Sequence, residues 1–174
     1  MKYLVKFFVI TFFLIVSTHA FAEQKIVVLD MKYVLNNSKA GKDAQEFLKK
    51  KFNDNAKKFT ELEKSLKKEE TDLLVAKVNL TKEEYTKKSD ALRKKVIDYQ
   101  SQRRSSIDKL TNQRLEARKI LMKQIEPILD SYIKKNSISI VIDKKNMLGG
   151  LTEYDITKII VEKLDKEFPS LNLQ

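Results

Sequence analysis

The groups in this sequence that could carry chemistry are nearly all carboxylates, lysines and arginines. The chain of 174 residues has no cysteine, and its one histidine is His19, near the N-terminus. Its three glycines are Gly41, Gly149 and Gly150. Past His19, the sequence therefore excludes a Cys or His nucleophile with its base, a histidine-based metal site and a glycine-rich phosphate loop.

Two carboxylate pairs remain as candidates for acid–base chemistry, Glu69-Glu70 and Glu83-Glu84. Both pairs lie among lysines on helical patterns, where a solvated helix face explains them better than a catalytic pair. We therefore expect a chain that is not an enzyme, with no catalytic residues, no metal ligands and no cofactor.

Positive charge is the strongest chemical signal, and it is unevenly distributed. The whole chain has 35 basic and 24 acidic residues, a formal net charge of +11. Residues 39–136 contain 26 of the basic and 16 of the acidic residues, whereas residues 23–38 and 137–174 together contain 7 and 8. The central segment is expected to meet something anionic: acidic protein segments, lipid headgroups or nucleic acid. For any single basic pair, a solvated helix face is the alternative. The anionic-surface candidates are Lys87, Lys88, Lys94, Lys95, Arg103, Arg104 and Arg114.

The N-terminus predicts export. Two lysines precede an apolar run from Phe7 to Val16, and Ala20-Phe21-Ala22 follows it. This order is typical of a signal peptide, here residues 1–22, cleaved after Ala22. A membrane anchor, the alternative, would need about 20 apolar residues, which is more than this run provides. No cysteine follows the run and no twin arginine precedes it, so the general export route is favoured. Export also removes nucleic acid from the expected partners.

Short β-rich segments flank the charged middle of the chain. Lys25–Asp30 is an apolar run that predicts a buried strand. Ile138–Asp143 alternates isoleucines with other residues and predicts a second strand. Asn146–Leu151, which contains two glycines, is expected to form a turn and a third short strand.

Helical segments complete both ends. Residues 31–37 predict one or two helical turns before a cluster of asparagine and serine that favours caps and turns. Thr157 is expected to cap a last helix, Lys158–Glu167. The apolar side of that helix is expected to be Ile159, Ile160 and Leu164.

Residues 39–136 form a charged helical segment with two apolar stripes. In the first stripe, Phe52, Phe59, Leu66 and Leu73 are seven residues apart, which is a heptad seam. The second stripe has three- and four-residue spacings and lies farther along the segment. Polar residues interrupt both stripes, so the two helices are expected to hold together weakly.

A reversal between the stripes is predicted at Thr81, which stands three residues before Glu84 in the pattern of a capping box. The midpoint between the two predicted strands falls at almost the same place. We therefore expect an antiparallel hairpin with its tip near residues 79–82 and two arms of comparable length, each reaching on the order of 60 Å. A single continuous rod is the alternative, and it would hold the two β segments far apart.

The β-containing base is too small to be complete in one chain. Three short strands and one helix cannot cover both faces of so apolar a sheet. We expect several copies to share one core, an oligomerisation body built from residues 23–38 and 137–174. Its expected residues are Ile26, Val27, Val28, Leu29, Ile138, Ile140, Val141 and Ile142. This argument leaves the number of copies open.

Together these pieces resemble the Skp (OmpH-type) family of periplasmic chaperones. The likeness is sharpest in three stretches, which look like the family's opening strand with its following loop, its second strand and its closing helix. The stretches are Lys25–Met31 through Val34-Leu35 to Ser38–Lys42, then Ile138–Asp143, then Asp155–Thr157 with Ile159–Leu164. In layout, the similarity covers the whole chain after the signal peptide.

The resemblance implies a fold that is mainly α with a small β base. A long, coiled-coil-like antiparallel helical hairpin would project from a short-stranded β-barrel body that is shared between subunits. The resemblance also implies a homotrimer in the periplasm, whose arms enclose a cavity and hold unfolded outer-membrane proteins without ATP.

Two kinds of contact are expected inside such a cavity. Basic arms would attract acidic clients, and inward-facing apolar side chains would add many weak contacts. The alternative is that apolar side chains close the hairpin seam, which is the favoured interpretation for Phe52, Phe59 and Leu66. The client-contact candidates are Phe47, Leu74, Val75, Val78 and Ile97.

Some family members also have a basic cluster proposed to bind lipopolysaccharide. Arg103-Arg104 resembles it locally, but counting back from the second strand places the corresponding site near Gln113 and Arg114. An anionic lipid or lipopolysaccharide is therefore a further candidate partner. The rival to a chaperone is a coiled-coil scaffold protein of the cell envelope, which would be expected to have a regular seam and a defined partner motif.

Overall fold

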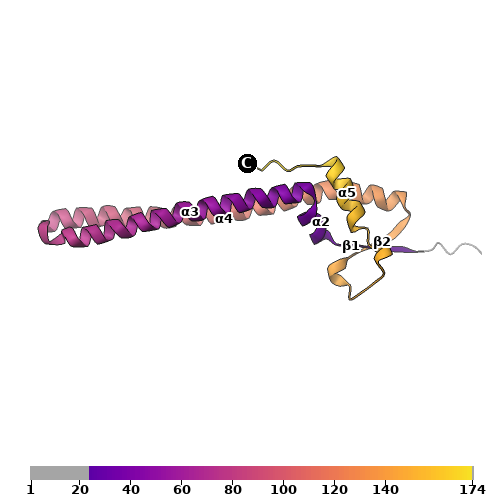
Figure 1. Ribbon diagram of the computed structural model, residues 1–174, viewed down its shortest axis with the longest axis horizontal. Coiled ribbons are helices and arrows are strands. Elements are labelled where there is room, and N and C mark those ends of the chain that lie inside the picture. Colours follow the sequence, from indigo (N-terminus) through magenta and orange to yellow (C-terminus); the bar gives the residue numbers. More distant parts are fainter. Residues whose placement is uncertain (1–23, 174) are drawn as a thin grey trace, which may run out of the picture.

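A long arm of two helices projects from a small base in the computed structural model, which describes residues 24–173 (Figure 1). The helices α3 and α4 run side by side as an antiparallel hairpin, and this confirms the predicted, mainly helical fold. The predicted signal peptide, residues 1–22, lies outside the described residues. In chain order the elements, with η for a 3-10 helix, are β1 Lys25–Leu29, α2 Met31–Asn37, α3 Lys39–Ala76, η1 Lys77–Asn79, α4 Lys82–Lys135, β2 Ile138–Asp143, η2 Lys144–Asn146, η3 Thr152–Tyr154 and α5 Thr157–Glu167.

The strands β1 and β2 confirm the two predicted β segments and pair in parallel as a two-stranded sheet. The third strand predicted at Asn146–Leu151 is wrong, because this segment is the end of η2 followed by a loop. The chain then meets β1 only at an isolated bridge between Val28 and Asp155. A strand needs a partner along its length to satisfy its backbone groups. Within the described part of one chain, no strand pairs with Asn146–Leu151. The sheet there consists of β1 and β2, and it does not close into a barrel.

Helices cover one face of the sheet. From β1, Val27 and Leu29 point to this side, where the end of α4 and one side of α5 meet them. Burial of each such aliphatic side chain contributes roughly 1.5–3 kcal/mol. The buried cluster consists of Val27, Leu29, Val34, Ile125, Ile128, Ile138, Ile156, Ile160 and Leu164.

The two helices of the arm differ in length, which corrects the expectation of comparable arms. α3 has 38 residues and α4 has 54, so α4 is longer by 16 residues or about 24 Å. Its last turns continue past the start of α3 into the base and run through Pro127. There Ile125 and Ile128 pack over the sheet. The extra length returns the chain to the end of the sheet where β1 began, and Ile138 of β2 pairs with Lys25.

The reversal at the tip confirms the predicted capping box. The Thr81 backbone N–H donates to Glu84 Oε2 at 2.9 Å, and the Glu84 N–H donates to Thr81 Oγ1 at 3.2 Å. Hydrogen bonds from the Thr81 backbone and hydroxyl lower the pKa of Glu84. The Glu84 carboxylate therefore stays charged at the positive end of the α4 dipole.

Side-chain caps and one glycine set the corners between β1, α2 and α3. Asp30 Oδ1 accepts from the Tyr33 N–H at 2.7 Å, and the buried Ser38 Oγ accepts from the Gly41 N–H at 3.2 Å. Gly41 lies so close to α2 that a Cβ there would come within 2.1 Å of the Leu35 carbonyl oxygen. The turn from α2 into the arm is therefore tightly packed.

The sequence predicted Thr157 as the N-cap of the last helix, and this prediction is wrong. The N-cap position is Ile156, and no side chain caps it. The Thr157 hydroxyl instead accepts a hydrogen bond from the Asp30 N–H at 2.8 Å, across 127 positions of the chain. This bond ties the end of β1 to the start of α5.

The predicted apolar side of α5 is correct at two positions of three. Ile160 and Leu164 are fully buried, whereas Ile159 is 39% exposed. On the same helix, Asp165 Oδ1 accepts from the Lys39 N–H at 2.7 Å. α5 therefore holds the first turn of the arm as well as the sheet.

The segment after α5 packs back onto the root of the arm, beside α3 in Figure 1. Leu171 is 7% exposed and joins a buried cluster formed by three alanines and a leucine of the two helices. Phe168 and Leu173 pack against the same cluster, which comprises Ala40, Ala44, Ala117, Leu121 and Leu171. The C-terminal segment thus bridges α3 and α4 where they enter the base.

Replacing Gly41 by alanine is expected to lower the free energy of unfolding by about 2 kcal/mol, because the new Cβ would collide with the Leu35 carbonyl. Urea unfolding followed by circular dichroism measures the loss. Gly149→Ala is the matched control, since a Cβ there meets no atom within 4 Å. Equal losses in both variants would contradict a tightly packed corner between α2 and α3.

Candidate functional site

The surface of the arm is the candidate site, because helix packing closes only part of it. Phe59 is the last buried residue of α3, and Ala117 is the first buried residue of α4. The Phe59 ring meets Tyr99 edge to face, with centroids 6.0 Å apart. From there to the tip, the two helices touch through half-buried side chains such as Leu66 and Leu73. The outer half of the arm therefore leaves apolar surface accessible to water.

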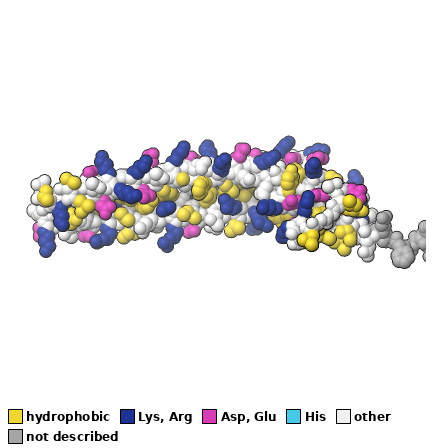
Figure 2. Space-filling model, turned by 60° about the horizontal axis from the view of Figure 1, so that its bottom comes forward, with side chains coloured by type: hydrophobic (Ala, Val, Ile, Leu, Met, Phe, Trp, Pro, Cys, Tyr) yellow, Lys and Arg dark blue, Asp and Glu magenta, His cyan; other side chains and the backbone are white. Residues whose placement is uncertain are grey.

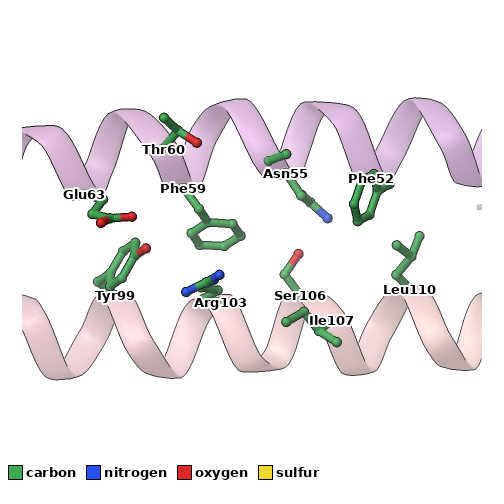
Figure 3. A pocket seen from close by; sticks show the side chains of 11 residues that line it. Phe52, Asn55, Phe59, Thr60, Glu63, Tyr99, Arg103, Ser106, Ile107 and Leu110 are labelled. Carbon is green, nitrogen blue, oxygen red and sulfur yellow. The ribbon is translucent and has the colours of Figure 1, made fainter.

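A groove runs between the two helices on one face of the arm, and Figure 3 shows its root-side hollow. This hollow has a volume of about 240 Å³, and a tip-side hollow has about 470 Å³. Glu63 and Tyr99 line both hollows, so the two adjoin. The apolar lining is Phe52, Phe59, Ile107 and Leu110 in the root-side hollow, and Leu66, Leu73, Leu74, Leu92 and Val96 in the tip-side hollow.

Charged side chains stand where the two hollows meet. Lys67 Nζ lies 2.8 Å from Glu63 Oε1. This hydrogen bond and the charge of Lys67 lower the pKa of Glu63, and Arg103 and Tyr99 lower it further. The same contact raises the pKa of Lys67. Both groups keep their charges at neutral pH, so this part of the groove can bind charged and apolar groups.

The two carboxylates of each sequence pair have different surroundings. Glu70 lines the tip-side hollow, whereas Glu69 lies on another side of the hairpin, where its Oε2 is 2.6 Å from Lys95 Nζ. Glu84 belongs to the capping box, and Glu83 is exposed beside it. Neither pair converges on a common point, as two carboxylates in a shared acid–base site would.

The client-contact candidates lie at separate places along the arm. Leu74, 57% exposed, lies in the groove, and Val75 and Val78 are 72% and 86% exposed near the tip. Ile97 is 58% exposed away from the groove. Phe47 is half-buried near the root, with Lys51 Nζ 5.4 Å from its ring centroid.

Sequence reasoning missed exposed apolar residues of α4, among them Ile107 and Leu115, and misassigned one of α3. Phe52 is 61% exposed and lines the groove, so its assignment to a closed seam is wrong. Ile107 and Leu115 are 59% and 61% exposed and were not singled out. A signal for Leu115 exists in its position two residues before Ala117, since residues two apart lie on nearly opposite sides of a helix.

The seven anionic-surface candidates do not form one cluster. Arg103 lines the root-side hollow, while Lys88 and Lys95 line a separate hollow together with Glu69 and Asp72. The remaining four, Lys87, Lys94, Arg104 and Arg114, are exposed at other positions along α4. Positive charge therefore surrounds the arm, and Figure 2 shows Lys and Arg side chains flanking hydrophobic ones along its length.

The second face of the sheet is open at one end. Ile26 pairs with Ile140 in the register, and these side chains are 41% and 47% exposed. The loop after β2 exposes more apolar surface, with Leu148 fully exposed and Leu151 66% exposed. Among the predicted body residues, Val27, Val28, Leu29 and Ile138 are buried within the chain, while Val141 and Ile142 are half-buried.

Asp155 fixes the end of this loop. Lys144 Nζ lies 2.7 Å from Asp155 Oδ2, and Asp155 Oδ1 accepts from the Thr157 N–H at 2.9 Å. Burial raises the pKa of Asp155, but the hydrogen bonds from Lys144 and Thr157 outweigh it and the pKa is lowered. The loop is thus anchored at both ends by a charged contact, while its apolar middle faces water.

Within residues 24–173, no helix has the length and apolar character to cross a membrane. No group of three or more His, Cys, Asp or Glu side chains in the same range is placed to hold a metal ion.

Known proteins share both the sequence pattern and the architecture. A family model described as outer membrane protein (OmpH-like) matches residues 25–164. A Skp-like protein from Pseudomonas aeruginosa is 26% identical over 170 residues, which cover 95% of this chain and 99% of the relative. A crystal structure from Caulobacter crescentus CB15, provisionally described as an outer membrane chaperone (OmpH-like), matches with a TM-score of 0.81 at 16% identity. That match covers 91% of this chain and 94% of the other. At this identity the structural match shows the fold.

Proposed function

The chain belongs to the OmpH-like family of outer membrane proteins, and on that premise we propose that it is an ATP-independent holdase chaperone. It binds unfolded outer-membrane proteins between basic helical arms and prevents their aggregation. It acts in the periplasm, after export by the general route and cleavage after Ala22.

The observation that carries this proposal is the exposed apolar surface of the arm. Large apolar side chains stay in contact with water from near the root to the tip, at Phe52, Leu74, Val78, Ile97 and Leu115. A protein that used the arm only as a spacer would gain nothing from this exposure, which favours aggregation. Many separate weak contacts suit a client that has no fixed structure, because their number supplies affinity without demanding one sequence.

The charge of the arm supports the same function. Residues 39–136 have 26 basic and 16 acidic residues. Attraction over several ångströms raises the rate at which acidic unfolded chains are captured before they aggregate, and salt screens it. Capture and release by weak contacts of this kind need no nucleotide and no catalytic group.

Self-association completes the proposed chaperone as a homotrimer. Ile26 and Ile140 leave one end of the sheet open, and the loop around Leu148 and Leu151 exposes further apolar surface of the base. Further copies that cover this surface would build a shared β-barrel body, from which the arms project around a cavity. Residues 23–38 and 137–174 form this body, and residues 39–136 form the arm.

Two other activities are secondary candidates. An anionic lipid or lipopolysaccharide could bind basic residues of the arm, such as Arg103, Arg104 and Arg114. A scaffold of the cell envelope is the rival function, and the irregular seam argues against it, because Asn55, Glu63 and Ser106 interrupt the contact between the helices.

The chain from Glu23 onward is expected to suppress the aggregation of a urea-denatured outer-membrane barrel protein on dilution, at about three chains per client. Light scattering measures the effect without nucleotide, at low and at high salt. Suppression should weaken at high salt, because part of the attraction is electrostatic. Unchanged scattering with a well-folded chain would reject the holdase and leave the scaffold.

Replacing Ile140 by aspartate is expected to abolish self-association, because a charge would be buried where copies meet. Sedimentation velocity measures the assembly state. Ile97→Asp, the same change at a somewhat more exposed isoleucine of the arm, should leave the assembly state unaltered. A trimer that persists in Ile140→Asp would show that this end of the sheet is not the assembly surface.

A further inference from the structure

A stripe of residues on α4 has features of a binding surface that the groove does not explain. Ile107, Leu115 and Met122 are 59%, 61% and 39% exposed. With Thr111 and Arg118 they follow one another at spacings of four, four, three and four residues, so all five lie along one side of the helix. We call these five residues the α4 stripe.

At Leu115 the stripe faces away from α3. Leu115 lies two residues after Gln113, which is half-buried, and two before Ala117, which is 3% exposed. Residues two apart are separated by about 200° around a helix, so Leu115 points nearly opposite to the seam. Ile107, at one end of the stripe, also lines the root-side hollow. The stripe therefore continues the apolar surface of the groove toward the root.

Unneutralised positive charge surrounds the stripe. Residues 103–123 contain seven basic residues and two acidic ones, Asp108 and Glu116. None of these seven forms an ion pair with any other described residue. Nearer the tip, residues 82–102 contain six basic and four acidic residues, and Arg93 and Lys95 each have a carboxylate partner. The net positive charge of α4 is therefore larger on its root half.

We propose that the α4 stripe binds extended, acidic segments of unfolded polypeptide, a specificity that rests on the proposed holdase function. Apolar side chains of the segment lie on Ile107, Leu115 and Met122, and its carboxylates meet Arg104, Arg114 and Arg118. From Arg104 to Met122 the helix rises about 27 Å, the length of about eight residues of extended chain. Successive side chains of an extended chain point to opposite faces, so a segment of that length in which pairs of acidic residues alternate with pairs of apolar ones presents both kinds to the stripe.

The layout of the stripe favours a polypeptide over a membrane surface. A helix that lies in a bilayer interface needs a broad, continuous apolar face. Here Thr111 and Arg118 stand between the three apolar side chains, and arginines border them. Such a mixture matches a partner whose own charged and apolar groups alternate.

Peptide binding to the chain from Glu23 onward tests the proposal. The probe is a fluorescent, unstructured peptide in which pairs of aspartates alternate with pairs of valine or phenylalanine, and its anisotropy reports binding. The charge variant is Arg104→Gln/Arg114→Gln/Arg118→Gln, and its control is Lys87→Gln/Lys88→Gln/Lys94→Gln, with the same loss of charge on the tip half of α4. The apolar variant is Leu115→Ser/Met122→Ser, and circular dichroism verifies the fold of each.

The charge variant is expected to bind the peptide about tenfold more weakly, and the apolar variant about fivefold, while the control changes less than about twofold. Equal weakening in the charge variant and its control would overturn the proposal, because attraction would then be spread over the arm. The proposal would also be overturned if the charge variant bound the peptide unchanged but no longer bound phosphatidylglycerol vesicles, because this result would identify a lipid surface. Aggregation suppression by the unaltered chain separates the holdase function from binding at the α4 stripe. If the unaltered chain does not suppress aggregation, the holdase function is rejected. If it does, but the charge variant and its control bind the peptide alike, only the stripe is rejected.

Discussion

The parallel pairing of β1 with β2 constrains the path of everything between them. A parallel partner must enter the sheet at the end where the first strand began, so residues 30–137 have to leave the base and return to that end. A helical hairpin does this with local hydrogen bonds alone, since α3 runs outward and α4 runs back. The additional residues of α4 cover the distance along the sheet, and Ile125 and Ile128 become part of the core there. The arm is therefore the crossover connection of the sheet, enlarged into a separate body.

This arrangement divides stability unevenly along the molecule. The root is held by the buried cluster over the sheet, by the Asp165–Lys39 hydrogen bond and by the C-terminal segment. Beyond Phe59 neither helix buries a residue fully until α4 reaches Ala117. A surface held open in this way, with low local stability, is suited to binding many clients. The exposed apolar side chains follow from this relaxed packing, because a tightly closed seam would bury them.

Local patterns in the sequence predicted those elements whose signals are themselves local. Thr81 and Glu84 marked the tip because a capping box involves only neighbouring residues, and the alternation in Ile138–Asp143 marked β2 in the same way. The failures concern contacts between distant segments. Thr157 bonds to Asp30 rather than capping its own helix, and no strand meets Asn146–Leu151. The heptad spacing of Phe52 placed it near the seam but could not show how closely α4 approaches it. The family resemblance, by contrast, depended on the order of elements, which the sequence contains in full.

If the arms hold a client that stays unfolded, amide hydrogen exchange of an outer-membrane barrel protein bound to this chain should reveal it. We expect the bound client to exchange nearly as fast as in urea, while amides in the outer halves of α3 and α4 gain protection and the base is unchanged. A bound client with protected, native-like strands, or an arm whose exchange does not change on binding, would contradict it.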